Sequence, residues 1–381
     1  MQTCGERSES MTRPNSITTN YSYDSLSRLL SVLHQSGGST IDGATYTVDA
    51  AGNRTSKQDW LASLTSNYTY DAIYQLTQVT QGTSSTESYS YDPVGNRTAS
   101  LGVASYTTNS SNELTATSNA SFTYDANGNT TSKTDSTGTT TYAWDYENRL
   151  TSITLPNNSG TVIFKYDPFG RRIYKSSSSS TSIYAHDGEE VVVITNGTGA
   201  TQSTYVQGSL VDEPLAMLSS SLVSYHEADA LGSITSLSNA AGVLVQTYSN
   251  DSFGNTTAAT GSLTNPFRFT AREFDSETNI VYYRARYFDS ITGRFITEDP
   301  LRFRAAANFY PYVGNDPVDL YDPLGLTVEV RCRTLGPRNL LSQSWWNALK
   351  DVGARYLLGA KHCFLAVNCG GGSANNCQLF R

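Results

Sequence analysis

The stretch "YSYDPVGNRT", residues 89–98, contains the pattern that decides the fold. Tyr89 and Tyr91 are two residues apart, so on a β-strand both rings face the same side. Asp92 can accept hydrogen bonds from nearby backbone N–H groups, and Gly95 can adopt the positive φ that a tight turn needs. The residues after Gly95 then begin a returning strand. This stretch therefore predicts a β-hairpin with one aromatic face.

The same hairpin pattern recurs along the chain. One unit, "YTTNSSNELT" from Tyr106, carries Asn109 in the Asp position, and with it the turn positions are 16 to 25 residues apart. One hairpin cannot bury its aromatic face alone, so neighbouring units must join into a continuous sheet. We therefore expect an all-β fold in which the hairpins form one long curled sheet. The other units begin at Tyr21, Tyr46, Tyr68, Phe122, Tyr142 and Phe164.

The composition suits this fold and limits the classes of function. The 381 residues include 25 Tyr and 29 Gly, and the recurring aromatic residues exclude a disordered chain. Residues 327–381 hold seven basic and two acidic side chains, which leaves 19 basic and 32 acidic side chains for the rest. The acidic body would repel phosphates, so we expect it not to bind nucleic acid. The basic tail reads as a separate unit with different partners.

The chain carries no signal of membrane insertion or of a disulfide framework. No run of about 18 apolar residues exists, so we expect no transmembrane helix. Residues 1–16 lack the apolar core of a signal peptide, so export would need a dedicated route. Five cysteines, four of them in the tail, do not describe a disulfide-bonded body.

A second kind of sequence begins at Tyr225 with "YHEADALGSITSLSNAAGVLVQTYSNDSFGN". Together with the hairpin units, it makes the chain resemble the RHS/YD-repeat family over nearly all of residues 18–326. In that family YD repeats spiral into a large hollow β-shell, and members include insecticidal toxin C components, bacterial RHS effectors and teneurins. Eight units are few for closing a shell, so we expect an incomplete shell or the C-terminal part of a longer protein.

The stretch "FTAREFDSETNIVYYRARYFDSITGRFITEDP", from Phe269 to Pro300, resembles the core-associated region of that family. Asn279 stands where the family usually has Gly, and Asn tolerates the left-handed conformation that the turn requires. We expect His226 to pack and hydrogen-bond and not to bind a ligand. We also expect three arginines to stack on aromatic rings and to pair with Asp275, Asp289 or Glu298; they are Arg272, Arg284 and Arg286.

Two Asp-Pro pairs, at Asp299 and Asp322, provide the candidate catalytic residues. The segment "DPLGL" after Tyr321 resembles the self-cleavage motif of the family, in which the bond after Leu is cut, here Leu326–Thr327. The resemblance implies an aspartyl-protease-like pair of Asp299 and Asp322, with Arg294 of the Gly-Arg-Phe motif in support. The alternative is that both pairs are ordinary turns that end strands. The first pair continues "DPLRF" and lacks the Gly-Leu of related proteins, so its turn could differ in shape.

The chemistry of such a pair is plausible. Amide hydrolysis needs a base that activates water and an acid that protonates the leaving nitrogen. Two close carboxyl groups do not both ionise easily, so one stays protonated and supplies the acid. An intramolecular reaction of this kind needs no cofactor.

The tail, residues 327–381, predicts a small α+β unit of strand, helix and strand. His362 and Cys377 are candidates for a cysteine hydrolase, whereas His362 and the adjacent Cys363 would point to opposite faces of a strand. The alternatives are structural cysteines, or a zinc site that would add Cys369. Because no clean C-x-x-C pair exists, we predict no metal.

These patterns predict a YD-repeat shell at 1–224, a core-associated domain at 225–326 and a toxin-like segment at 327–381. The leading hypothesis is a bacterial toxin-delivery protein, secreted or at the cell surface, whose shell encloses the tail and releases it by self-cleavage. Its partners would be its own tail and a secretion machine or immunity protein. The alternatives are a cell-surface protein that binds carbohydrate or protein without cleavage, and a hydrolase toxin in the tail.

Overall fold

The computed structural model describes residues 10–220, 222–304, 306–326, 367–369 and 377–379. These residues form strands joined by turns, and no α-helix occurs among them, which confirms the predicted all-β class. None of the described segments is a helix that is long and apolar enough to cross a membrane. The short 3-10 turns are η1 (Pro156–Asn158), η2 (Phe269–Ala271), η3 (Arg302–Arg304) and η4 (Val313–Asn315).

Two antiparallel sheets follow one another along the chain, and within each sheet every strand pairs with its neighbours in sequence. The first sheet consists of β1 (Ser10–Thr12), β2 (Thr18–Tyr23), β3 (Leu29–Ser36), β4 (Ser39–Val48), β5 (Arg54–Asp59), β6 (Leu64–Tyr70), β7 (Leu76–Gln81), β8 (Ser84–Tyr91) and β9 (Arg97–Ser100). The second consists of β10 (Tyr106–Thr108), β11 (Leu114–Thr117), β12 (Ala120–Tyr124), β13 (Thr130–Asp135), β14 (Gly138–Trp144), β15 (Leu150–Thr154), β16 (Thr161–Tyr166), β17 (Arg172–Ser176), β18 (Thr181–Asp187), β19 (Glu190–Thr195), β20 (Thr201–Gln207), β21 (Pro214–Ser219), β22 (Leu222–Ala228), β23 (Ile234–Asn239), β24 (Leu244–Asn250) and β25 (Thr256–Thr260). We call β1–β25 the shell strip.

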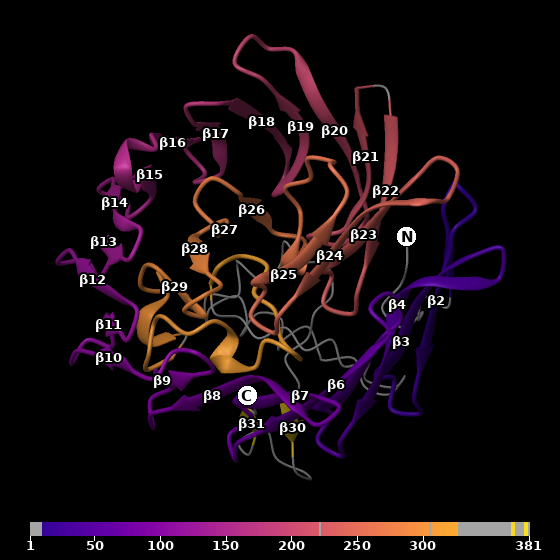
Figure 1. Ribbon diagram of the computed structural model, residues 1–381, viewed down its shortest axis with the longest axis horizontal. Helices are drawn as coiled ribbons and strands as arrows, with labels where there is room; N and C mark the ends of the chain where they lie inside the picture. Colours follow the sequence, from indigo (N-terminus) through magenta and orange to yellow (C-terminus); the bar gives the residue numbers. More distant parts are fainter. Residues whose placement is uncertain (1–9, 221, 305, 327–366, 370–376, 380–381) are drawn as a thin grey trace.

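The shell strip bends into a ring (Figure 1). Its curvature has a local cause, because the strand pairing shifts register immediately before the repeat turns, as between Thr123 and Tyr124 or between Ser90 and Tyr91. Such irregularities bend a strand and increase its twist. One per repeat is enough to turn a flat ribbon into a curled one.

The repeat turns are built on the aspartate side chain, as the sequence predicts. In the unit from Tyr89, Asp92 Oδ1 accepts the N–H groups of Val94 (3.0 Å) and Asn96 (2.8 Å). Gly95 has a φ of +83° and donates its N–H to the Asp92 carbonyl (3.0 Å). The same backbone bond also closes turns beyond the eight units of the sequence pattern, such as those at Asn196, Asp229, Asn239 and Asp251.

The second aromatic residue of a unit ties it to the preceding one. Tyr91 donates its hydroxyl to the Leu76 carbonyl (2.9 Å), and Tyr166 donates to the Leu150 carbonyl (2.7 Å). The aromatic rings are thus the inner face of the strip and also its cross-links. This explains why the unit repeats both the Tyr and the Asp.

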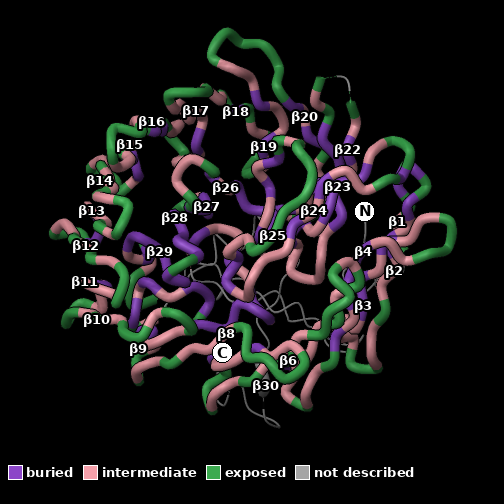
Figure 2. Tube along the Cα trace, viewed as in Figure 1, coloured by how far each residue is buried: buried purple, intermediate pink, exposed green. Residues whose placement is uncertain are grey.

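A core segment, which we define as residues 261–326, lies inside the ring (Figure 1, orange). Its four-stranded sheet is made of short strands that are almost entirely buried (Figure 2, purple). Asn279 has a φ of +58°, which confirms the predicted left-handed turn. The strands are β26 (Glu273–Asp275), β27 (Ile280–Tyr283), β28 (Arg286–Asp289) and β29 (Arg294–Phe295).

The core segment packs against several parts of the shell strip at once. Tyr283, Phe288 and Phe295 pack with Leu76 and Val79 of β7 in one hydrophobic cluster. A second cluster joins residues of β15 and β16 to the core segment, and its core-segment members are Ile280, Tyr282, Tyr287 and Ile296. The apolar face that the hairpins cannot bury alone is therefore covered from within.

The two ends of the shell strip meet at a polar seam, formed by residues 13–46 and by β22–β23. Arg13 donates to the His226 carbonyl (2.7 Å), and Asn15 donates to Ser238 Oγ (2.8 Å). Asp42 accepts the hydroxyl of Thr235 (2.6 Å). In the described part of the chain no backbone ladder crosses this seam, since the first and second sheets stay separate. Side chains alone therefore join the ends of the ring.

Two short strands of the tail are described, β30 (Val367–Cys369) and β31 (Cys377–Leu379), and they pair antiparallel. The predicted helix of the tail lies outside the described residues. Residues 225–260 include β23, β24, β25 and most of β22, all in the second sheet, and the core segment follows them along the chain.

The seam makes stability depend on pH. Glu227 is fully buried, and burial raises its pKa to about 8. A carboxyl group with a raised folded-state pKa stabilises the fold below its unfolded pKa of about 4.3, and this contribution is lost as pH rises towards the folded value. From pH 7 to pH 8 the free energy of unfolding should fall for the native chain. We predict that it falls less for Glu227→Gln, and that the difference is up to about 1.4 kcal/mol.

Denaturant titrations at several pH values measure this difference. The buried histidines of the seam do not obscure it, because burial lowers the pKa of His34 to about 3 and that of His226 to about 4. Both are therefore neutral in the folded chain above pH 7. Glu147→Gln is the control, since this side chain is half exposed at the outer rim. Parallel curves for Glu227→Gln and the native chain would contradict the prediction.

Candidate functional site

The candidate aspartate Asp322 begins a turn of the same design as the repeat turns. Asp322 Oδ1 accepts the N–H groups of Leu324 (3.3 Å) and Leu326 (3.0 Å), and Gly325 has a φ of +67°. These are the relative positions that Asp92 binds in the unit from Tyr89. The segment that ends at the predicted cleavage site is therefore one more YD turn, placed inside the ring.

Asp299 begins a second turn of this kind, four residues after β29. Its Oδ1 accepts the N–H of Leu301 (2.8 Å), and its carbonyl accepts the N–H of Arg302 (2.9 Å). Arg302 has a φ of +49° and takes the position that Gly325 holds in the other turn. The loss of the family's Gly-Leu after Pro300 thus leaves this turn in place, although it puts a side chain in a conformation that favours glycine.

Arg286 of β28 brings the two aspartates together. Its Nη2 lies 3.0 Å from Asp299 Oδ2 and 3.1 Å from Asp322 Oδ2. All three side chains are at most 1% exposed. One guanidinium nitrogen thus bridges two carboxyl groups from turns that are 23 residues apart in sequence.

The other contacts of Arg286 fix it in place and hold the end of the Asp322 turn. Its Nε donates to the Gly325 carbonyl, and its Nη1 donates to the Phe309 carbonyl (3.0 Å). The guanidinium carbon lies 3.5 Å from the centre of the Phe295 ring. Next to it, the Ala285 N–H donates to the Leu324 carbonyl (3.2 Å). Residues 324–326 are therefore held along β28 up to the predicted cleavage site.

The electrostatics of the pair favour one proton on two carboxyl groups. Burial is the main cause that raises the pKa of Asp322, and the charge of Asp299 acts in the same direction. Arg286 and the N–H of Leu326 oppose this rise. Because one cation faces two buried carboxyl groups, ionising both would leave a net negative charge out of water. The arrangement can thus present an acid and a base side by side.

The predicted acidic partners of the three arginines are wrong, and for Arg272 and Arg284 the reason is distance in sequence. Arg272 and Arg284 pair with Asp212, from the loop between β20 and β21, and not with the carboxylates of their own region. Asp275 pairs instead with Arg172 of β17 (Figure 1). These ion pairs join the core segment to the shell strip, so no local pattern indicates them. Stacking on an aromatic ring is confirmed for Arg286, over Phe295, and for Arg272, over Tyr283.

Arg294, predicted from the family motif to support the pair, lies against other residues. Its guanidinium carbon is 4.6 Å from the centre of the Tyr310 ring, and its Nη2 donates to the Asn112 carbonyl. Arg286 is therefore the residue that contacts both aspartates. The sequence signal for it was present, because Arg286 is one of the arginines in the most specific stretch. His226 is buried and contacts Asn265 Oδ1 (3.2 Å), as predicted for a hydrogen-bonding residue.

The tail candidates cannot be placed against this pair. Thr327 and His362 lie outside the described residues, and of Cys377 only the backbone position in β31 is described. Within the described ranges no group of three or more His, Cys, Asp or Glu side chains is arranged to hold a metal ion.

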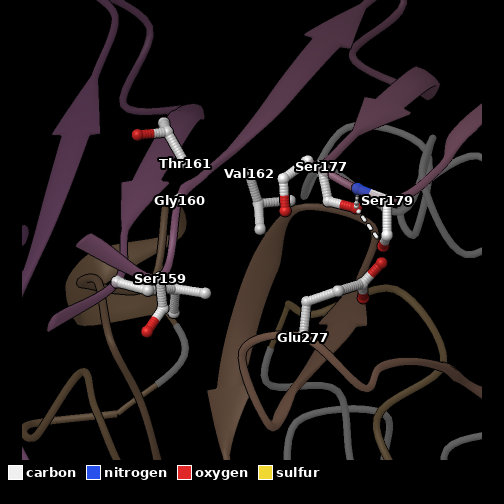
Figure 3. Close-up of a pocket in the computed structure, with 9 residues that line it drawn as sticks. Ser159, Gly160, Thr161, Val162, Ser177, Ser179 and Glu277 are labelled. Carbon is white, nitrogen blue, oxygen red and sulfur yellow. Dashed lines mark hydrogen bonds between the residues drawn. The ribbon is translucent and has the colours of Figure 1, made fainter. Parts of the chain in front are cut away.

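A separate small pocket of about 120 Å³ opens beside η1 and β16 (Figure 3). Serine hydroxyls of residues 177–179 and the carboxylate of Glu277 line it, and Lys175 Nζ holds Glu277 at 3.0 Å. Its nine lining residues include no aromatic ring. Its walls therefore offer no aromatic ring on which a planar ligand could stack.

The sequence pattern of the teneurin YD-shell family matches residues 60–318 of this chain. The match covers more than half of the chain and includes both the repeat units and most of the core segment. The chain belongs to the teneurin YD-shell family. The YD repeats predicted from "YSYDPVGNRT" are thus the repeats of this family.

Two of the relatives are bacterial proteins. The tRNA3(Ser)-specific nuclease WapA of Bacillus spizizenii is 32% identical over 264 residues, which make up 66% of this chain and 11% of WapA. The toxin protein Tse5 of Pseudomonas aeruginosa is 38% identical over 63 residues, 16% of this chain and 5% of Tse5. The chain spans well under half of the length of the curated relatives it matches. It is thus a YD-shell chain related to bacterial toxins.

Among solved structures, the TcdB2–TccC3–Cdc42 crystal structure matches with a TM-score of 0.69 at 20% identity. The match covers 83% of this chain and 19% of the other. At this identity the likeness concerns the fold, and it supports the YD-shell architecture independently of the sequence pattern.

The bridging arginine should be essential to stability at neutral pH. We predict that Arg286→Met lowers the free energy of unfolding by about 3–5 kcal/mol at pH 7, because two buried carboxyl groups lose their counter-charge. At pH 4.5 the loss should be smaller, since protonated carboxyl groups need no cation. Denaturant midpoints at both pH values test this, with the exposed Arg304→Met as control. An equal loss at both pH values would argue against the charge explanation.

Gly325 should tolerate no side chain. A Cβ there would lie 2.0 Å from the Tyr283 carbonyl and 3.0 Å from the Arg286 nitrogen, and φ is +67°. We predict that Gly325→Ala displaces the Asp322 turn and costs at least 1–3 kcal/mol or so in strain. Gly170→Ala is the control, because its φ is similar but nothing lies within 4 Å of its added Cβ. Thermal unfolding of the two variants separates the effects, because Gly325→Ala adds a steric clash and backbone strain, whereas Gly170→Ala adds backbone strain alone.

Proposed function

We propose that this YD-shell chain cuts itself between Leu326 and Thr327 and so frees its C-terminal segment. The observation that carries the proposal is the pair of buried carboxyl groups on one nitrogen of Arg286, with Asp322 capping the N–H of Leu326. A structural turn needs neither a second carboxyl group nor a shared arginine. The arrangement instead resembles an acid–base pair placed at the end of its own substrate segment.

In the proposed reaction a water molecule adds to the Leu326 carbonyl carbon while one carboxylate removes its proton. The carbon–nitrogen bond to Thr327 then breaks, and the leaving nitrogen takes a proton from the second carboxyl group. The products are a carboxyl group at Leu326 and a free amine at Thr327. Burial raises the pKa of Asp322, so we assign it the proton that the leaving nitrogen takes, and Asp299 is the proposed base. The roles follow from environment, since the side chains are alike.

Positioning would supply much of the acceleration. Residues 324–326 are fixed by the Ala285 N–H, by Arg286 and by the two bonds of Asp322, so the bond to be cut needs no binding step. A reaction within one folded chain avoids the entropy cost of bringing two molecules together.

We further propose that residues 1–224 and 225–326 are the shell and its core-associated domain, and that residues 327–381 are the cargo. The relation to the toxins WapA and Tse5 supports a role in toxin delivery. The proposed partners are the enclosed tail and, outside the cell that makes the chain, a target. An export machine and an immunity protein would complete such a system.

Intact-mass analysis of the purified full chain tests the cleavage. We predict a fragment that ends at Leu326, and no such fragment in Asp322→Asn or Asp299→Asn, because an amide can neither remove nor supply the proton. The expected loss of rate is at least 100-fold, since general acid–base catalysis contributes about that much or more.

The matched control is Asp167→Asn, because Asp167 is also followed by Pro, begins the same turn and contacts no second carboxyl group through a shared arginine in the described contacts. This variant should weaken one repeat turn and still cleave. Full-length native chain that persists after folding would overturn the proposal. Cleavage that survives in both aspartate variants would move the chemistry away from this pair.

A further inference from the structure

The carbonyl group of Phe309 links the two halves of the candidate site. It accepts the Nη1–H of Arg286 (3.0 Å) and the backbone N–H of Asp299 (3.1 Å). Phe309 lies in the loop between Asp299 and Asp322. A small movement of this one carbonyl would therefore displace both the bridging arginine and the first aspartate.

The residue before Phe309 is fastened to a repeat turn of the shell strip. The side-chain amide of Asn308 donates to Asn96 Oδ1 (2.7 Å) and to the Val94 carbonyl (3.2 Å), and Asn308 is buried. Asn96 and Val94 belong to the turn of Asp92. The two residues are 212 positions apart in sequence, so this contact exists only in the folded shell.

The residue after Phe309 is fastened to another repeat turn, the second one after that of Asp92. Tyr310 is fully buried and donates its hydroxyl to the Gly128 carbonyl (2.9 Å). Its ring lies under the guanidinium of Arg294 and at right angles to the Tyr124 ring. Gly128 belongs to the turn of Asp125, which lies beyond the Asp92 turn along the strip.

The next residues of the loop continue this attachment. Asn315 donates to Gln75 Oε1 (3.0 Å) and to the Gly95 carbonyl (2.9 Å). Asp319 accepts the N–H of Arg54 at 3.1 Å. From Tyr310 to Asp319 the loop therefore passes back along the ring, from the Asp125 turn to the start of β5.

We propose that Asn308 and Tyr310 are positioning residues for the self-cleavage, and that they couple it to the assembly of the repeat turns at Asp92 and Asp125. The inference rests on the proposed function. Neither residue touches the reacting bond. Each holds one side of Phe309, whose carbonyl holds Arg286 and Asp299. The shell strip thus sets the geometry of the pair, and the pair acts only after these two repeat turns have formed.

The test follows cleavage during refolding. Insoluble full-length precursor is dissolved in denaturant and refolded by dilution at a series of pH values, and the fraction cut before Thr327 is followed by gel and mass spectrometry. Asn308→Ala and Tyr310→Phe should each slow the cleavage of folded chain by roughly fivefold to 100-fold. The lower figure corresponds to the loss of one hydrogen bond, and the upper figure to the misplacement of a catalytic group. Asn96→Ala should slow it similarly, and Asn96→Ala with Asn308→Ala should be no worse than either alone.

The pH profile separates positioning from loss of stability. The charged and titratable groups that face Asp322 are Arg286 of β28, Asp299, Tyr283 of β27 and Tyr312 before η4. In Asn308→Ala, Arg286 is held less firmly and lowers the pKa of Asp322 less. The alkaline limb of the plot of cleavage rate against pH should therefore move to higher pH in this variant. A variant that is only less stable would yield less folded chain with an unmoved limb.

The matched control is Asn53→Ala. Asn53 holds the place in the Asp49 turn that Asn96 holds in its own, and it donates to Asp49 Oδ2 (2.8 Å). It should cleave at the native rate once folded. Native rates and an unmoved limb in both Asn308→Ala and Tyr310→Phe would overturn the inference. Absence of cleavage in the native chain would instead overturn the proposed function. If Asn308→Ala does not fold, Tyr310→Phe, which removes one hydroxyl group, decides the matter.

Discussion

The structure depends on one interaction, the aspartate side chain that accepts backbone N–H groups two and four residues further along. This contact fixes a tight turn at the end of each strand without help from distant residues. It recurs around the shell strip, as at Asp92, and again in the core segment at Asp322. Because each turn uses only one carboxylate oxygen for these bonds, the other oxygen is free to serve a second purpose. In most repeats this second oxygen binds the side chain four residues further along, such as Asn96 in the Asp92 turn. At Asp322 it faces Arg286.

That second purpose separates a structural turn from a candidate catalytic one. In repeat turns such as those of Asp24, Asp145 and Asp167 the carboxylates are 13–18% exposed, and hydrogen bonds within the turn outweigh desolvation and lower their pKa. Inside the ring the same turn places Asp299 and Asp322 where they are at most 1% exposed, with one arginine between them. Burial then changes the chemistry of the group without any change in the turn. Under the proposed function, position alone would thus turn a repeat turn into half of a reactive pair.

The sequence predicts what is local and misses what joins distant parts of the chain. Aromatic alternation and the Asp turn are encoded within ten residues, so the hairpins, the Asn279 turn and the strand order could be predicted from them. The partners of Arg272 and Arg284 come from a loop some 60 to 70 residues away, and the seam between Arg13 and His226 spans 213 residues. No periodicity carries such information. One signal was readable, because Tyr321 to Gly325 repeats the Tyr-Asp-Pro-x-Gly of Tyr91 to Gly95.

The same distinction orders the proposed reaction in time. The turns of Asp299 and Asp322 can form early, because their contacts are local, but the loop between them is held by contacts such as Asn308–Asn96 and Asn315–Gln75, 212 and 240 residues apart. Long-range contacts form late, since they must first overcome the entropy of closing a long loop. An unfolded or half-folded chain would therefore carry both aspartates without the geometry that makes them reactive. If the pair cuts after Leu326, the cut must follow the closing of the ring, and the segment beyond Leu326 stays joined to the chain until the shell around it exists.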